Sequence, residues 1–197
     1  KKLAPGSYLS IEKGLLKEEK YYSIPYNHTH LDQISYDHGK DKLKTLIEDS
    51  VKARLISDVP LGAFLSGGID SSVIVAEASK FTSHLNTCSI GYADEPYFDE
   101  THYANLVAKK FITNHQVFKL TNDDLYQHLN DVLDYIDEPF ADSSALAVYI
   151  LSHYTREHVT VALSGDGADE LFGGYNKHLA HLRAINGGLE NTMIKAG

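Results

Sequence analysis

A run of small and hydroxyl-bearing residues at Leu65–Ser72 has the composition of an anion-binding turn. Gly67 and Gly68 lack a Cβ atom, so the backbone can turn sharply there and approach an anion. The residues that follow predict the start of a helix, whose free N–H groups and dipole attract negative charge without a lysine. Neither the lysine-bearing P-loop pattern nor the dinucleotide fingerprint occurs here. The sequence therefore predicts a phosphate cradle at this turn.

Asp70 places a carboxylate inside this predicted phosphate site. A carboxylate beside phosphates is favourable when a divalent cation bridges them, as Mg²⁺ does when it binds one or two carboxylates together with phosphate oxygens. The alternative is an ordinary strand-to-helix turn in which Ser66 or Asp70 caps the helix. The complete pattern favours the phosphate site over the simple cap.

A second turn, Leu163–Glu170, repeats the same order of features: an apolar strand, a Ser-Gly pair, and acids at the start of a predicted helix. If both preceding strands belong to one parallel sheet, both turns open at the same edge, because ligands of such sheets bind beyond the carboxyl ends of the strands. Asp70 and Asp169 could then share one cation. The alternative is a helix start where acids are favoured by the dipole. Two such turns together favour a nucleoside triphosphate site.

The elements that must position these turns alternate regularly after Pro60. Apolar runs of strand length are separated by helical periods, which is typical of βαβ units and a parallel sheet covered on both faces. The sequence thus predicts an α/β fold with a Rossmann-like, doubly wound parallel sheet. The predicted strands are 61–65, 86–91, 116–120 and 159–163, and the predicted helices are 71–81, 100–111, 123–136 and 144–157.

The first part of the chain has a different texture. Two β-prone segments, 8–12 and 20–24, flank a charged connection at 14–19 and predict a short N-terminal β-hairpin. A polar and aromatic stretch without a period, 25–40, is expected to be a loop. An amphipathic helix over 39–57 is then predicted from apolar residues that recur every four positions: Leu43, Ile47, Val51 and Leu55.

Composition excludes several classes of protein. The chain of 197 residues is 43% hydrophobic and 23% charged, as in ordinary globular domains. Its net charge of −9 disfavours nucleic acid as a partner. No apolar run reaches the length of a membrane span and no signal peptide is recognisable, so we expect no membrane association. The single cysteine, Cys88, lies in a predicted strand, where we expect a buried, inert thiol in a reducing, cytoplasmic setting.

Three segments, in order, resemble a known family. Ser66–Ser72 resembles the PP-loop of ATP pyrophosphatases, enzymes that cleave ATP between the α- and β-phosphates. Together with Asp137–Ser144 and Ser164–Tyr175, it is similar to the synthetase domain of glutamine-hydrolysing asparagine synthetase. The similarity extends over about residues 40–180. Leu3–Leu9 also resembles the end of the glutaminase domain that precedes the synthetase domain in that family.

The resemblance implies a division of the chain. Residues 1–37 would be the end of a glutaminase-type domain with its linker, and residues 38–197 a PP-loop synthetase domain truncated at its C-terminal end. The family's synthetase domain continues into a helical region with a lysine thought to contact the α-phosphate, and no residue here can be given that role. We therefore expect a fragment with weak or absent synthesis alone.

The resemblance also implies a reaction. The side-chain carboxylate of aspartate attacks the α-phosphorus of ATP to give β-aspartyl-AMP and pyrophosphate, and glutamine-derived ammonia then displaces AMP to give asparagine. Catalysis of this kind depends mainly on positioning and on neutralising the charge of the leaving pyrophosphate. ATP and Mg²⁺ are the implied cofactors, and the implied partners are aspartate, ammonia and the preceding glutaminase domain. A homodimer is left open.

By the same resemblance, site roles are transferred residue by residue. Asp70 and Asp169 would hold Mg²⁺, and with Asp166 they form the implied catalytic set. Asp166 stands where many relatives carry Glu, so the charge is kept while the reach is shorter. The implied nucleotide-binding residues are Leu65, Ser66, Gly67, Gly68, Asp70, Ser71, Ser72, Ile90, Ser164 and Gly165.

Three further positions have two interpretations each. Asp99 matches a family acid near the nucleotide, but it can equally cap the next helix. Ser143 and Ser144 match a substrate-side region, but either can be a simple N-cap. At the level of the whole domain, the alternatives are another adenylating amide-forming enzyme, such as one resembling β-lactam synthetase, a catalytically silent nucleotide-binding module, and a plain scaffold protein.

Overall fold

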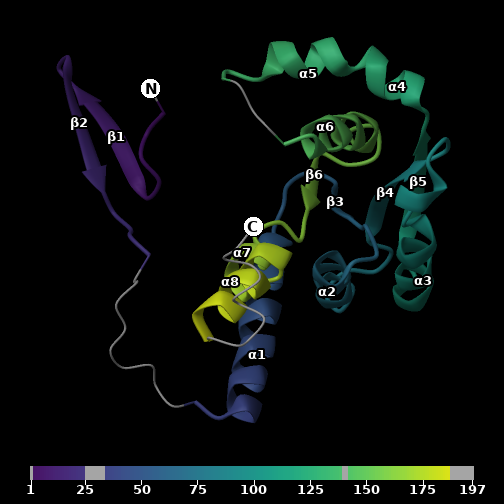
Figure 1. Ribbon diagram of the computed structural model, residues 1–197, viewed down its shortest axis with the longest axis horizontal. Coiled ribbons are helices and arrows are strands. Elements are labelled where there is room, and N and C mark those ends of the chain that lie inside the picture. Colours follow the sequence, from purple (N-terminus) through teal and green to yellow (C-terminus); the bar gives the residue numbers. More distant parts are fainter. Residues whose placement is uncertain (1, 25–33, 139–141, 187–197) are drawn as a thin grey trace. The chain divides into compact units, whose positions relative to one another are not determined.

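The computed structural model describes residues 2–24, 34–138 and 142–186 (Figure 1). The chain separates into two compact units, residues 1–43 and 44–197. The boundary lies inside helix α1 (Tyr36–Arg54), which begins before the predicted 39–57 and ends earlier. The expected division at residue 37 and its assignment to a glutaminase-type domain stay predictions. The expected loop at 25–40 is helical from Tyr36, and its residues 25–33 lie outside the described part.

The first unit contains the expected N-terminal hairpin, but its second strand differs from the predicted one. Strand β1 (Ser7–Glu12) pairs antiparallel with β2 (Leu15–Lys20), so the charged connection itself forms the strand. The reason is the turn. Lys13 and Gly14 both have positive φ angles, 50° and 80°, as in the two-residue turns that match the twist of a hairpin. Such a turn requires pairing to resume at Leu15.

The second unit is built on a four-stranded parallel sheet, as predicted. Its strands are β3 (Leu61–Phe64), β4 (Asn86–Tyr92), β5 (Asn114–Leu120) and β6 (Val161–Leu163), in the order β5-β4-β3-β6. The chain thus winds outward from β3 to β5 and then returns to place β6 on the other side of β3. This reversal between β3 and β6 is the topological switch point, where ligands of open α/β sheets bind.

Helices cover both faces of this sheet, which confirms the doubly wound fold (Figure 1). Helices α2 (Ile69–Ala78) and α3 (Thr101–Phe111) contact each other and pack on one face. Helix α6 (Ser144–Thr155) packs against β4 on the opposite face, where the ring of Tyr154 stacks on Phe118 with centroids 5.2 Å apart. The sheet is therefore the middle of three layers.

The main hydrophobic core lies between the sheet and the α2–α3 layer. Small residues on the helices let them approach the sheet closely, and Val51 of α1 joins the same cluster, with Ile47 and Leu55 packed against it. The amphipathic stripe predicted for α1 is thus confirmed except at Leu43, whose side chain is exposed. The buried members of the core are Val51, Ala63, Leu65, Val75, Ala78, Leu85, Ala104 and Ala108.

The segment between β5 and α6 is divided into more helices than predicted. A single helix was expected at 123–136, but α4 (Asn122–Gln127) and α5 (Leu129–Tyr135) are separated at His128. The His128 ring lies against Tyr149 and His153 of α6, so a tertiary contact fixes the break. The remaining elements are η1 (Pro96–Phe98), α7 (Ala168–Phe172) and α8 (Asn176–Asn186), and α8 was not predicted.

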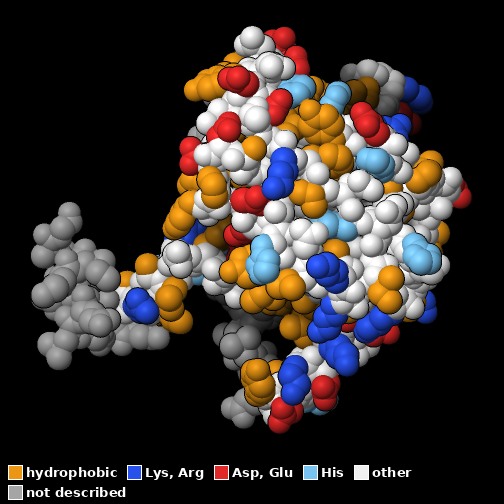
Figure 2. Space-filling model, turned by 90° about the vertical axis from the view of Figure 1, so that its right-hand side faces the viewer, with side chains coloured by type: hydrophobic (Ala, Val, Ile, Leu, Met, Phe, Trp, Pro, Cys, Tyr) orange, Lys and Arg blue, Asp and Glu red, His pale blue; other side chains and the backbone are white. Residues whose placement is uncertain are grey.

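The surface and the helices give two further observations. On the face shown in Figure 2, acidic and basic side chains are both present, with lysines and arginines mainly in the lower half. The charge of this face is therefore mixed, although the whole chain has a net charge of −9. Within the described residues, every helix is too short or too polar to cross a bilayer.

Candidate functional site

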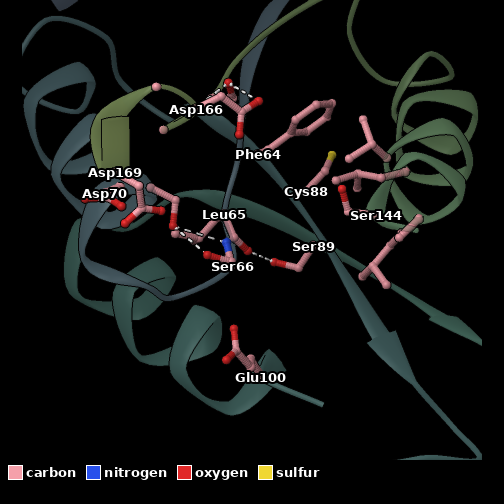
Figure 3. Close-up of a pocket in the computed structure, with 18 of the residues that line it drawn as sticks. Phe64, Leu65, Ser66, Asp70, Cys88, Ser89, Glu100, Ser144, Asp166 and Asp169 are labelled. Carbon is pink, nitrogen blue, oxygen red and sulfur yellow. Dashed lines mark hydrogen bonds between the residues drawn. The ribbon is translucent and has the colours of Figure 1, made fainter. Parts of the chain in front are cut away.

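A cavity of about 610 Å³ opens at the carboxyl ends of β3, β4 and β6, at the switch point of the sheet. Its volume is within the range of small-molecule sites. Both glycine turns contribute to its wall, as do the N-terminal part of α6 and the segment after β4 (Figure 3). Of the residues expected at the site, those that line it are Leu65, Ser66, Asp70, Ser71, Ile90, Ser164, Gly165, Asp166 and Asp169.

The first turn is held in shape by its own serines. Ser66 Oγ lies 3.0 Å from Ser71 Oγ, which also accepts a hydrogen bond from the Ser66 N–H at 3.2 Å. The Gly68 N–H donates to Ser66 Oγ at 3.2 Å, and Ser71 donates to the Gly68 carbonyl. Gly68 itself is the N-cap of α2 and has no side-chain cap, so neither Ser66 nor Asp70 caps this helix.

Gly67 explains why this turn needs a glycine. Its φ is +87°, and a Cβ atom there would lie 2.4 Å from the Ala104 N and 2.5 Å from the Tyr103 Cβ. The turn therefore packs directly on the start of α3, which only glycine allows. Three of the residues expected to bind the nucleotide belong to this turn but do not line the cavity: Gly67, Gly68 and Ser72.

The second turn packs on the first. A Cβ atom on Gly165 would lie 2.8 Å from the Ser71 N and 2.9 Å from the Asp70 Cβ, so glycine is required for the two turns to meet. Ser164 donates to Asp166 Oδ2 at 3.0 Å, which fixes that carboxylate beside the turn. Gly167, with a φ of +90°, then starts α7, the helix that bears Asp169.

Asp70 and Asp169 come from different turns and face the same side of the cavity (Figure 3). The contact at Gly165 explains why they are neighbours, because it fixes the start of α7 against the start of α2. The backbone after α7 supports Asp169. The Gly174 N–H donates to the Asp169 carbonyl at 3.0 Å, and the Asp169 carboxylate lies directly against the Gly174 backbone. Asp70 and Asp169 therefore line one cavity, and the cation that they are expected to share stays a prediction.

The structure adds acids that sequence reasoning did not single out. Glu100, Asp142 and Glu170 also line the cavity, whereas none of its described lining residues is a lysine or arginine. Tyr175 donates to Glu170 Oε1 at 2.7 Å, and this hydrogen bond lowers the pKa of Glu170 below its usual value. The same bond raises the pKa of Tyr175 to about 12. Tyr175 and Glu170 were quoted only as part of a motif, and their pairing could not be read from spacing.

The opposite wall of the cavity is apolar. Phe64, Cys88 and Ile90 project from the sheet toward Val148 and Leu151 of α6, and Figure 3 shows Cys88 beside this helix. Cys88 is 1% exposed, and burial raises the pKa of its thiol, as expected for an inert cysteine. The cavity thus has an acidic half beside the glycine turns and an apolar half beside α6. An apolar ring would fit the second half, whereas an anion in the first half would need a cation bound with it.

Asp99 does not line the cavity, and it is not the N-cap of α3, which is Glu100. Its carboxylate accepts a hydrogen bond from the Thr101 N–H at 3.0 Å, at the first residue of the helix. Ser144 lines the cavity at the first turn of α6, whereas Ser143 does not. The Ser144 N–H donates to Asp142 Oδ1 at 2.9 Å, so the local capping acceptor is the Asp142 side chain.

These features place a cavity lined by two glycine turns at the switch point of a doubly wound parallel sheet. Comparison with protein-family models matches residues 42–192 to one family, described as asparagine synthase. This match covers more than half of the chain and includes both glycine turns. The chain belongs to the asparagine synthase family.

Similar curated proteins carry names of the same kind. The putative glutamine-hydrolysing asparagine synthetase 2 of Methanocaldococcus jannaschii is 47% identical over 149 residues, covering 73% of this chain and 28% of that protein. The glutamine-hydrolysing asparagine synthetase 1 of Bacillus subtilis is 36% identical over 200 residues, covering 98% of this chain and 31% of that protein. The chain therefore spans about a third of the length of these relatives.

Solved structures with a similar chain path include two synthetases. The NH3-dependent NAD synthetase of Campylobacter jejuni has a TM-score of 0.43 at 14% identity, covering 73% of this chain and 62% of that chain. The NMN synthetase of Francisella tularensis has a TM-score of 0.46 at 18% identity, covering 73% of this chain and 59% of that chain.

Proposed function

We propose that this chain is the nucleotide-binding part of an ATP-dependent, amide-forming synthetase whose product is asparagine. In the proposed reaction, the side-chain carboxylate of aspartate attacks the α-phosphorus of ATP to give β-aspartyl-AMP and pyrophosphate. Ammonia, released from glutamine by a glutaminase domain of the complete protein, then displaces AMP. Such a reaction fits the reducing, cytoplasmic setting expected from the single cysteine.

The observation that most supports this proposal is the meeting of two glycine turns at one cavity. The turns follow β3 and β6, on the two sides of the switch point, and Gly165 packs on the backbone of Asp70 and Ser71. By its sequence alone each turn is compatible with a capped helix start, but neither helix has a side-chain cap. Together the turns bring the start of α2 and two carboxylates to one cavity, as the binding of a metal-bound triphosphate would require.

The donor set fits Mg²⁺. Asp70 and Asp169 offer two carboxylates on one side of the cavity, and a bound triphosphate would complete the oxygen ligands that this cation prefers. Six acids line the cavity and no described lining residue is a lysine or arginine, so a polyanion bound there needs a cation brought with it. When bound, Mg²⁺ would neutralise charge on the phosphate oxygens as pyrophosphate leaves.

The residues of this chain would then act by binding and orientation. The backbone of 66–72 would hold the β- and γ-phosphates, while Leu65 and Ile90 flank the adenosine beside the apolar wall. Ser164 and Gly165 would contact the nucleotide from β6. Asp166, which Ser164 holds in place, faces the same cavity and would act on the acyl-adenylate or the incoming ammonia. These roles are transferred from the family pattern, and their positions line one cavity except for some of 66–72, among them Gly67, Gly68 and Ser72.

A second candidate is an enzyme that adenylates another carboxylic acid on the same scaffold. The nucleotide half of the cavity does not distinguish acceptors, because the features described above all address phosphate, metal or adenine. A catalytically silent nucleotide-binding module is disfavoured, since the acids of both turns are present and share one cavity.

The distinguishing experiment measures AMP and pyrophosphate formation by the complete protein with a panel of carboxylic acids. We expect AMP with aspartate, in equal amount to pyrophosphate, and none with glutamate, malonate or carboxylated β-lactam precursors. If another acid gave AMP and aspartate gave none, the asparagine assignment would be wrong while the adenylating class would stand. Formation of ADP in place of AMP would overturn the class itself.

A further inference from the structure

A row of hydrogen-bonded polar side chains, two of them buried and two partly buried, connects the sheet to the first glycine turn. Thr87 and Ser89 lie two positions apart on β4 and are 0% and 3% exposed, and Thr87 is the register partner of His115 on β5. Buried polar groups require hydrogen-bond partners. These residues find them in one another and in Thr113, and the row ends at the Leu65 carbonyl, where the turn begins.

The hydrogen bonds of this row assign its donors. The Ser89 hydroxyl donates to the Leu65 carbonyl, so its oxygen remains free to accept from the His115 Nε2–H at 3.4 Å (Figure 3 shows the Ser89–Leu65 bond). His115 Nδ1, then unprotonated, accepts from the Thr87 hydroxyl at 2.9 Å, and Thr87 accepts from Thr113 at 2.8 Å. Burial favours the neutral imidazole that this assignment requires.

Leu65 is fixed at three points as a result. Its side chain is 1% exposed in the core, its N–H donates to the Cys88 carbonyl at 2.9 Å, and its carbonyl accepts from Ser89. The pairing of β3 with β4 ends at Phe64 and Cys88. Beyond that point the Ser89 side chain holds the end of β3 by its hydrogen bond to the Leu65 carbonyl. The next residue, Ser66, starts the first glycine turn and lines the cavity.

We propose that Ser89 is a positioning residue for the first glycine turn, acting through the Leu65 carbonyl, and that His115 and Thr87 hold the Ser89 hydroxyl in the orientation this requires. The inference rests on the proposed function in so far as the turn binds the phosphates of ATP. Backbone N–H donors bind an anion well only when they are held in place beforehand, and the start of the turn has no charged side chain to do this. The row supplies that constraint.

The test compares Ser89→Ala, His115→Phe and His115→Gln in the complete protein. Ser89→Ala and His115→Phe should raise the KM for ATP about tenfold, with kcat changed much less, because a hydrogen bond that positions a binding turn acts on substrate and transition state alike. His115→Gln keeps an N–H donor toward Ser89 and should restore a KM near that of the wild type. A purely structural role would lower the active fraction and leave KM unchanged, which would overturn the inference.

A second readout does not depend on activity. With ¹⁵N-glycine labelling, the amide resonances of Gly67 and Gly68 should shift in Ser89→Ala and His115→Phe but not in His115→Gln. The matched control is Ser79→Ala, which removes a buried hydroxyl that has no hydrogen-bond partner among the described residues, at the other end of α2. Unmoved glycine resonances in Ser89→Ala would contradict the inference whatever the substrate. A wild-type protein that consumes no ATP, with the resonances shifted as expected, would count against the proposed function alone.

Discussion

At the residue scale, the acids of the cavity are held by different neighbours. Asp166 accepts from Ser164, Glu170 accepts from Tyr175, and Asp169 lies against the Gly174 backbone. Two of these carboxylates are thus oriented by hydroxyl donors, and the third is in contact with backbone.

Cys88 allows a direct test of the apolar wall, because it is the only cysteine of the chain. The thiolate is the reactive form, and the raised pKa together with 1% exposure leaves little of it accessible. We expect alkylation by iodoacetamide at pH 8 to be at least about tenfold slower in the folded protein than in urea. A rate equal to that of the unfolded chain would show that Cys88 is not in the wall of the cavity.

His115 gives the stability of the protein a pH dependence of known sign. Burial lowers its pKa below the ordinary value of 6.5, so the unfolded chain takes up a proton near pH 6.5 that the folded chain does not. The free energy of unfolding should therefore fall as the pH drops below about 6.5, by up to about 1.4 kcal/mol per pH unit from this group, until the folded His115 is also protonated.

The variant His115→Gln isolates this effect, because the carboxylates titrate alike in both proteins. We expect the stability difference between wild type and variant, measured by urea unfolding, to shift in favour of the variant between pH 7 and pH 5.5. A difference that stays constant over this range would contradict the lowered pKa of the partly buried His115.

At the element scale, the packing of one turn on another is what joins the acids of β3–α2 to those of β6–α7. Gly165→Ala tests this. The added methyl would meet the backbone of Asp70 and Ser71 at under 3 Å, so the turns must separate. We expect at least about a tenfold loss in kcat/KM for ATP, since small displacements of positioned groups are costly.

The control for this variant is Gly39→Ala, on α1, where the nearest atom to a new Cβ would be 3.9 Å away in the Ile34 side chain. Alanine is the better helix former by about 1 kcal/mol, so this variant should be as stable as the wild type or more so, with unchanged kinetics. Equal kinetics in Gly165→Ala and Gly39→Ala would mean that the two turns do not act as one site.

Sequence patterns predicted the strands and helices that bury an apolar face, because periodicity reports burial. They did not predict β2, since Leu15–Lys20 is rich in charge and its pairing follows from the Lys13–Gly14 turn. The break at His128 depends on ring contacts with α6, and such contacts between distant segments leave no local signal. The same holds for the hydrogen-bonded row that ends at Leu65, whose members are far apart in sequence.

The sequence predicted which turns and acids form the candidate site, but not the contacts that hold these acids in place. The two glycine turns, Asp70 and Asp169 were recognised from their order after apolar strands, and parallel topology places them at one edge of the sheet. By contrast, the support of Asp169 by Gly174 and of Glu170 by Tyr175 depends on the path of the chain after α7. A short helix followed by two glycines does not reveal which side chain they will face.

At the scale of the whole molecule, the larger unit contains the cavity that both glycine turns line. The chain spans about a third of the length of its curated relatives. The described lining is acidic on one side and apolar on the other, and it has no lysine or arginine. We therefore propose that backbone N–H groups and a shared cation bind the phosphates. The release of ammonia from glutamine is proposed for another domain of the complete protein.

The measurement that tests this most directly is aspartate-dependent exchange of labelled pyrophosphate into ATP, in the wild type, Asp70→Asn and Asp169→Asn. Each variant should lose at least about 100-fold in Mg²⁺-dependent exchange with its fold intact by circular dichroism, because each removes charge from the same cation site. The matched control is Asp134→Asn, an exposed acid on α5 outside the cavity, which should exchange like the wild type. Full exchange in a folded Asp70→Asn or Asp169→Asn variant would contradict the shared site.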